Sequence, residues 1–183
     1  MVQSDSFSAW IEIEGVWTEE YKEEITEDED EDGLVVTCWI ASEEAKTFSV
    51  HFKDESCSAP RWRSLSADGL PVYGRVLEPK CKGCPSEVTR AIKSVPVSST
   101  EMCPLMFLKI TMTDDDTYMD SPINTKFGEI TLSVWNTRLR KYHKGKAETD
   151  TSAAPSLGGP VHETSKKIGG HCIKSAFKVL DQG

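Results

Sequence analysis

Residues 34–40, which read Leu-Val-Val-Thr-Cys-Trp-Ile, decide the fold class of this chain. In an extended chain the side chains alternate between two faces, so the four apolar residues of even number share one face. Val35 and Trp39 fall on the opposite face. A segment that is apolar on both faces is typical of a strand covered on both sides.

The same two-residue period recurs along the chain. No window between residues 1 and 140 keeps a helical period for three turns. Polar residues 42–46 predict a hairpin after Ile40, and Asp68-Gly69 predicts another hairpin. These patterns favour a mainly β fold, an antiparallel β-sandwich, with a partly open β-barrel as the alternative. The further alternating segments begin with the apolar residues Phe7, Phe48, Met106 and Ile130.

The sequence divides into three regions. Residues 1–140 hold the strand signals and form the expected β-sandwich domain. Residues 141–160 are rich in Lys, Ser, Ala, Gly and Pro and are expected to form a flexible linker. Residues 161–183 are expected to form a short flexible basic tail, with a short helix over 161–167 and a final strand or a disordered tail over 171–179.

Composition narrows the functional class. The chain has 183 residues, of which 38% are hydrophobic, and its formal net charge is -9. Such a charge argues against a protein that binds nucleic acid or an anionic membrane over its whole surface. The start of the sequence lacks the features of a signal peptide, and six cysteines then predict free thiols in the cytoplasm or nucleus.

Two groups of residues have side chains that could bind a metal ion or take part in redox chemistry. The Cys81-x-x-Cys84 pair has the spacing of half a zinc site or of a redox dithiol, but a structural zinc site needs four ligands. Asp114–Asp116 could bind a hard cation, although the spacing of an EF-hand loop is absent. His51 and His143 are expected to be solvated. We assign no catalytic residue, metal ligand or cofactor, and an enzyme or metal-binding protein that uses these groups remains the alternative.

Charge is segregated along the chain. Residues 1–37 hold 13 acidic side chains and one basic side chain, and residues 27–32 are all acidic. Residues 138–183 carry a net charge of +5, from nine basic and four acidic side chains. This pattern favours a non-enzymatic protein-interaction module with an unidentified, basic protein partner, or with its own basic tail folded back on the acidic loop. A homo-oligomer is left open.

Three tryptophans lie opposite the main apolar set of their strands. Trp10, Trp39 and Trp135 would form an exposed aromatic patch if one sheet face were open to solvent. We expect them instead to pack under a loop or second sheet, or across a dimer interface, because large aromatic side chains are usually covered.

Several blocks, in a fixed order, resemble one known family. They are Phe7–Gly15, Cys38–Glu43 with Phe48, Asp68-Gly69 with Gly74, Met106–Asp116, Gly128–Trp135, and Val161–Lys167 with Gly170-His171. Together they look like an uncharacterised family of domains of unknown function from basidiomycete fungi. The resemblance implies a fungal source and a compact β-rich domain, and it implies no catalytic residues. The Cys81–Cys84 pair and the acidic run lie outside the pattern.

Overall fold

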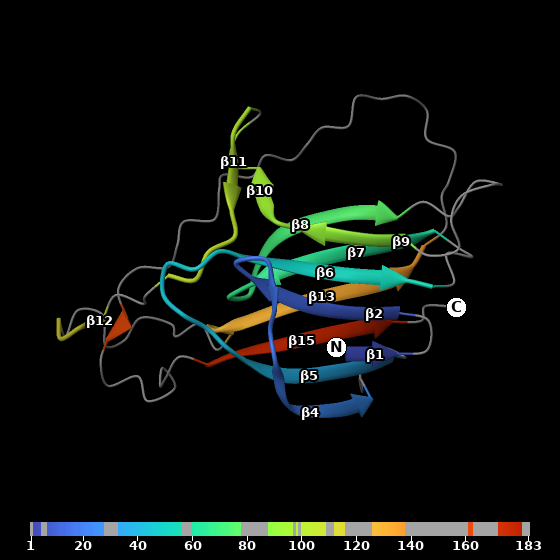
Figure 1. Cartoon of the computed structure of the whole chain (residues 1–183), viewed down its shortest axis with the longest axis horizontal. Helices are drawn as coiled ribbons and strands as arrows, with labels where there is room; N and C mark the ends of the chain where they lie inside the picture. Colours follow the sequence, from blue (N-terminus) through green and yellow to red (C-terminus); the bar gives the residue numbers. More distant parts are fainter. Residues whose placement is uncertain are drawn as a thin grey trace.

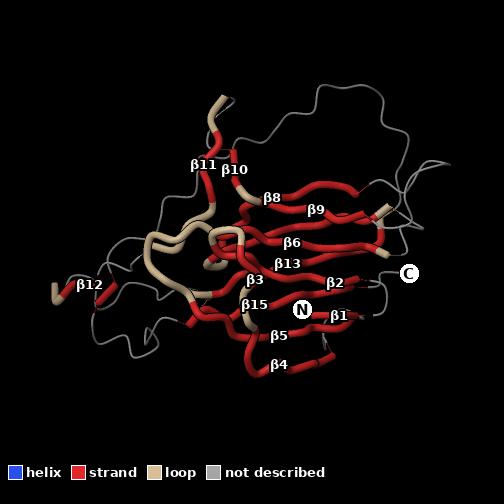
Figure 2. Tube along the Cα trace, viewed as in Figure 1, coloured by secondary structure: helices blue, strands red, loops and turns tan. Residues whose placement is uncertain are grey.

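Every element in the described part of the chain is a β-strand, as Figures 1 and 2 show. The computed structural model describes residues 2–4, 7–27, 33–55, 60–77, 88–96, 98, 100–108, 112–115, 126–137, 161–162 and 172–180. No helix occurs in these residues, so the prediction of a mainly β fold with antiparallel sheets is confirmed. None of the sheets closes into a barrel.

A five-stranded sheet contains the first strands of the chain. Its order is β1-β2-β6-β9, with β3 paired to β2, and every pairing in it is antiparallel. The edge strand β9 therefore lies beside β6. The strands are β1 (Val2–Ser4), β2 (Phe7–Ile13), β3 (Val16–Trp17), β6 (Phe48–Asp54) and β9 (Val88–Ile92).

A six-stranded sheet has the order β4-β5-β15-β13-β7-β8. Its pairings are antiparallel except for the parallel pair of β13 and β15. Its strands are β4 (Glu20–Glu27), β5 (Gly33–Ala41), β7 (Arg61–Ala67), β8 (Leu70–Leu77), β13 (Glu129–Asn136) and β15 (Cys172–Leu180). Two small sheets pair β10 (Ser94–Pro96) with β11 (Met102–Pro104), and β12 (Met112–Thr113) with β14 (Val161–His162).

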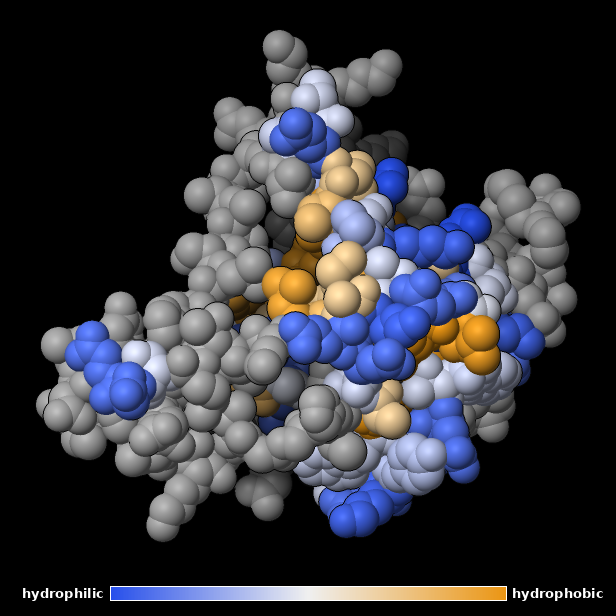
Figure 3. Space-filling model, turned by 60° about the vertical axis from the view of Figure 1, so that its left-hand side comes forward, coloured by the Kyte–Doolittle hydropathy of each residue, from blue (hydrophilic) through white to orange (hydrophobic). Residues whose placement is uncertain are grey.

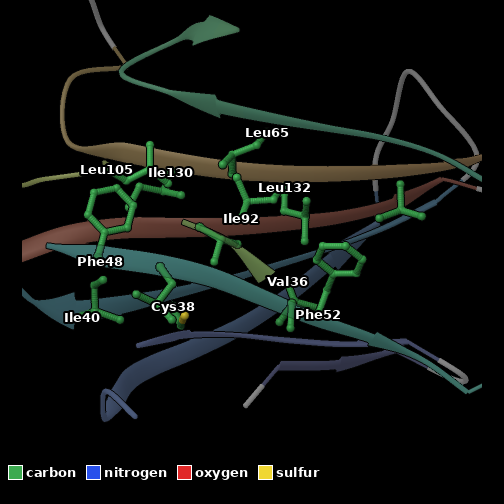
Figure 4. Packing of buried hydrophobic residues seen from close by; sticks show 14 of the residues in the cluster. Val36, Cys38, Ile40, Phe48, Phe52, Leu65, Ile92, Leu105, Ile130 and Leu132 are labelled. Carbon is green, nitrogen blue, oxygen red and sulfur yellow. The ribbon is translucent and has the colours of Figure 1, made fainter. Parts of the chain in front are cut away.

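Buried side chains from both large sheets form one hydrophobic core, part of which Figure 4 shows. The expected alternation holds in the strands that supply it, since each buries every second residue over most of its length. Burial of this apolar surface is the main favourable term in folding. The members are Phe7, Ala9, Ile11, Val36, Cys38, Ile40, Phe48, Val50, Phe52, Leu65, Ile92, Leu105, Phe107, Ile130, Leu132 and Val134.

The chain crosses from one sheet to the other after Ala41. The prediction of a hairpin over residues 42–46 is therefore wrong, because β5 pairs with β4 and β15 while β6 pairs with β2 and β9. Alternation sets which face of a strand is buried, but it does not choose the neighbouring strand. The hairpin at Asp68-Gly69 is correct: it joins β7 to β8, and both residues have positive φ, 51° and 75°. Two such residues are typical of a type I′ turn.

The alternation expected from Met106 onward has the wrong phase. Leu105 and Phe107 are buried, while Met106 and Leu108 are exposed. Phe107 stacks on Phe48, with ring centroids 4.4 Å apart, and backbone hydrogen bonds tie residues 105–107 to residues 45–48. Both alternating sets are apolar here, so the sequence could not show which set faces inward.

The C-terminal region contributes strands. Cys172–Leu180 forms β15 between β5 and β13, in the interior of the six-stranded sheet, and the prediction of a flexible tail is not confirmed. Val161–His162 forms β14, so the helix expected from residue 161 does not begin there. The linker expected over 141–160 lies outside the described residues. No helix in the described residues is long and apolar enough to cross a membrane.

Candidate functional site

Most residues singled out for metal or redox chemistry lie outside the described part of the chain. This applies to Cys81, Cys84, Asp116 and His143. Asp114 and Asp115 are described and exposed, after the short strand β12. Among the described residues, no group of three or more His, Cys, Asp or Glu side chains is arranged to hold a metal ion.

A polar cluster on the outer face of the five-stranded sheet combines serine, histidine and glutamate. The Nε2 atom of His51 lies 2.9 Å from Ser49 Oγ and 3.2 Å from Glu12 Oε2. The His51 ring stacks on Trp10, which in turn stacks on Trp17. His51 was expected to be solvated, but only 12% of its side chain is exposed. Burial lowers the pKa of His51, and the charge of Glu12 partly offsets this effect.

This cluster does not have the geometry of a catalytic triad. A triad needs the carboxylate at Nδ1 of the histidine, so that Nε2 is left to take the proton of the serine. Here both Ser49 and Glu12 approach Nε2. The other carboxylate oxygen of Glu12 accepts a hydrogen bond from Trp10 Nε1 at 3.2 Å. The network therefore joins two strands and gives no activated nucleophile.

The edge strand β4 is exposed over almost its whole length. Seven of its eight residues are exposed, and the first, Glu20, is half-buried. It pairs with β5 along one side and ends the six-stranded sheet on the other. In Figure 1 it lies at the lower rim of the molecule, below β5. An edge strand presents backbone N–H and C=O groups that a further strand can pair with.

Both faces of β4 remain uncovered by the core. Ile25 is the register partner of Val36, which is 1% exposed, yet Ile25 itself is 61% exposed. On the other face, Tyr21 is the partner of Trp39, and their exposed fractions are 47% and 40%. The six-stranded sheet thus extends past the core at this edge, and β4 forms an overhang with apolar side chains on both faces.

The overhang is strongly acidic. Glu20, Glu23, Glu24 and Glu27 lie on β4 against a single Lys22, and the acidic run continues into residues 28–32, which lie outside the described part. A β-bulge between Tyr21 and Glu24, with φ of 50° at Lys22, shifts the register of the strand. The glutamates also affect a buried thiol. The pKa of Cys38 rises to about 12, chiefly because of burial and next because of the negative charge of Glu20.

The tryptophans do not form one patch. Trp39 is exposed rather than covered, and Trp10 and Trp135 are half-buried on the outer faces of the two sheets. Trp39 is therefore not packed under a loop or second sheet of the described chain, while cover across a dimer interface stays a prediction. The space-filling view in Figure 3 shows a mixed surface, with hydrophobic residues in orange between hydrophilic residues in blue.

Sequence reasoning found the acidic segment but missed the edge strand and the polar cluster. Residues 20–27 lack a clean alternation, and their strand character follows from pairing with β5. Glu12 and Ser49 are register partners on β2 and β6, and only that pairing brings them together. Comparison of the chain with models of known families, with curated proteins and with solved structures gave no match.

Proposed function

We propose that the chain is a non-enzymatic interaction domain, built as an antiparallel β-sandwich, whose strand β4 binds a basic segment of another protein. The observation that supports this function is the overhang: an acidic edge strand with both faces exposed. We keep the cytoplasmic or nuclear setting that the sequence favours and the fungal origin that the family resemblance implies.

Strand addition is the binding mode that fits this edge. A partner segment in extended conformation would pair with the backbone of β4 and so lengthen the six-stranded sheet. Its Lys or Arg side chains would meet the glutamates of β4, and its apolar side chains would cover Ile25 on one face or Tyr21 on the other. Attraction of this kind speeds association and weakens as salt screens the charges.

A defined peptide tests the proposal. The probe is a fluorescein-labelled peptide as long as β4, with alternating Lys and Val, and the measurement is fluorescence anisotropy at low and high salt. We expect binding at low salt that falls as salt rises. The double variant E23K/E24K should lower the affinity roughly tenfold, because it reverses two exposed charges at the binding edge.

The matched control is E43K/E44K, which makes the same charge change on the connection between β5 and β6. An equal loss of affinity in both variants would mean that net charge, and not β4, attracts the peptide. Binding that is indifferent to salt and to both variants would contradict the proposal. Stronger binding after removal of residues 138–146 would indicate that the basic segment of the chain itself competes for β4.

A further inference from the structure

A buried arginine lies on the strand next to the opposite edge of the six-stranded sheet. Arg63 of β7 is 8% exposed and points toward the five-stranded sheet. Its guanidinium carbon lies 4.6 Å from the ring centroid of Phe52 on β6 and 5.7 Å from that of Tyr73 on β8. An aromatic ring stabilises the flat face of a guanidinium group by stacking. The N–H groups at the edge of the guanidinium still need hydrogen-bond acceptors.

That N–H edge is largely unsatisfied. Arg63 Nη2 donates to the Tyr73 hydroxyl at 3.5 Å, which is long for a hydrogen bond. The Nε and Nη1 atoms are buried and have no acceptor among the described residues. No ion pair with a carboxylate is found for Arg63 in the described part of the chain. A buried charge without such partners is costly, so this arrangement favours binding of an acceptor from outside.

Two more arginines lie on the neighbouring edge strands, and their charges act on Arg63. Arg75 on β8 is the register partner of Arg63, and Arg90 on β9 is the register partner of Phe52. Both are exposed, and neither forms an ion pair within the described residues. Burial lowers the pKa of Arg63 first of all; Tyr73 raises it, and the charges of Arg90 and Arg75 lower it further.

The neighbouring Arg61 shows the contrast. Its Nη1 lies 3.2 Å from Oδ2 of Asp54, a fully buried carboxylate on β6, so this positive charge is offset by a partner across the two sheets. One strand thus carries two arginines toward the core; within the described ranges, Arg61 has a carboxylate partner and Arg63 has none. A buried polar group without a partner calls for an explanation, and a bound anion would give the Arg63 guanidinium the acceptors that it lacks.

We propose that Arg63, Arg75, Arg90 and the Tyr73 hydroxyl bind a doubly charged phosphate group at the edge where β8 and β9 end the two sheets. In Figure 1 both strands lie toward the upper side of the molecule. A phosphate presents several acceptor oxygens, which suits the planar donor edges of more than one arginine. Two negative charges also balance three positive ones better than a single carboxylate does. The site goes beyond the proposed function, because it lies at the edge opposite to β4.

The test is isothermal titration calorimetry of the whole chain with inorganic phosphate, supported by thermal unfolding in phosphate and in sodium chloride of matched ionic strength. We expect one saturable site and a rise in Tm with phosphate that chloride does not reproduce. The double variant R75Q/R90Q, at two exposed positions, should keep the fold and lose roughly tenfold or more in affinity. The control K46Q removes a positive charge far along the chain and should bind as the wild type does.

A second variant separates binding from folding. Arg63→Met removes the buried charge, so we expect unchanged or higher stability without phosphate and no response to phosphate. Equal responses to phosphate and chloride, or wild-type affinity in R75Q/R90Q, would overturn the proposal. Phenyl phosphate then distinguishes the source of the group: tighter binding than inorganic phosphate indicates a phosphate monoester, and weaker binding indicates free phosphate.

Discussion

The two edges of the six-stranded sheet differ in charge and in cover. At one edge, β4 carries four glutamates, and Ile25 on its core-facing side is mostly exposed. At the other, β7 and β8 direct Arg61, Arg63 and Tyr73 toward β6 of the five-stranded sheet, with Arg63 buried over Phe52. The net charge of -9 therefore does not reveal that one edge of this sheet carries a group of arginines. The comparison teaches that pairing between sheets, and not composition, decides where a charged ligand can approach.

The largest expected effect follows from removing the ring that supports the arginine edge. Phe52→Ala should destabilise the protein by about 3–5 kcal/mol, because Phe52 is 1% exposed and lies in the shared core. Ile25→Ala at the β4 overhang should change stability by less than about 0.5 kcal/mol. Urea unfolding of both variants measures the difference, and similar losses would show that β4 is covered after all.

A second variant tests the ion pair between the sheets. Arg61→Met should cost about 3 kcal/mol, since it removes the cation beside the buried Asp54 carboxylate. The control is Glu55→Gln, next to Asp54 in the sequence, which breaks the partly exposed pair with Lys53 and should cost less than about 1 kcal/mol. Comparable unfolding midpoints for the two variants would contradict the burial of the Asp54–Arg61 pair.

Thiol reactivity reports on the core next to the acidic edge. Cys38 is buried, and its pKa of about 12 keeps it protonated, whereas Cys103 is exposed. Because the thiolate is the reactive form, iodoacetamide at about pH 8 should label Cys103 in the native protein and leave Cys38 unlabelled until unfolding. Peptide mapping by mass spectrometry reads each site separately. Rapid native labelling of Cys38 would mean that β4 and β5 separate readily.

The smallest expected effect concerns pH. Burial lowers the pKa of His51 from its ordinary value of 6.5, so the folded state binds this proton less readily than the unfolded state. His51 should therefore reduce stability as pH falls below about 6.5, and the loss stops growing below the folded pKa. In His51→Gln this part of the pH dependence should disappear from urea unfolding curves. An unchanged slope over that window would mean that His51 is not held neutral.

Alternation predicted the faces of the strands but not their neighbours. The buried sets of β2, β5, β6 and β13 and the turn at Asp68-Gly69 follow from residue type alone. The crossover after Ala41 and the phase of residues 105–108 do not, since each depends on which strand lies alongside. The same holds for the site residues. From the sequence alone Arg63 is an ordinary polar position, and only the strand pairing shows that it lies beside Arg75 and over Phe52.

The position of β15 has a consequence for how the chain reaches this state during synthesis. Until residues up to Leu180 have left the ribosome, β5 and β13 have no strand between them, and the sheet exists only as the groups β4–β5 and β13–β7–β8. Both inner edges then have unpaired backbone groups, a condition in which growing chains associate with one another. Pairing β15 with β5 also closes a very long loop, which slows folding. A nascent chain of this protein should therefore depend on chaperones until β15 is in place.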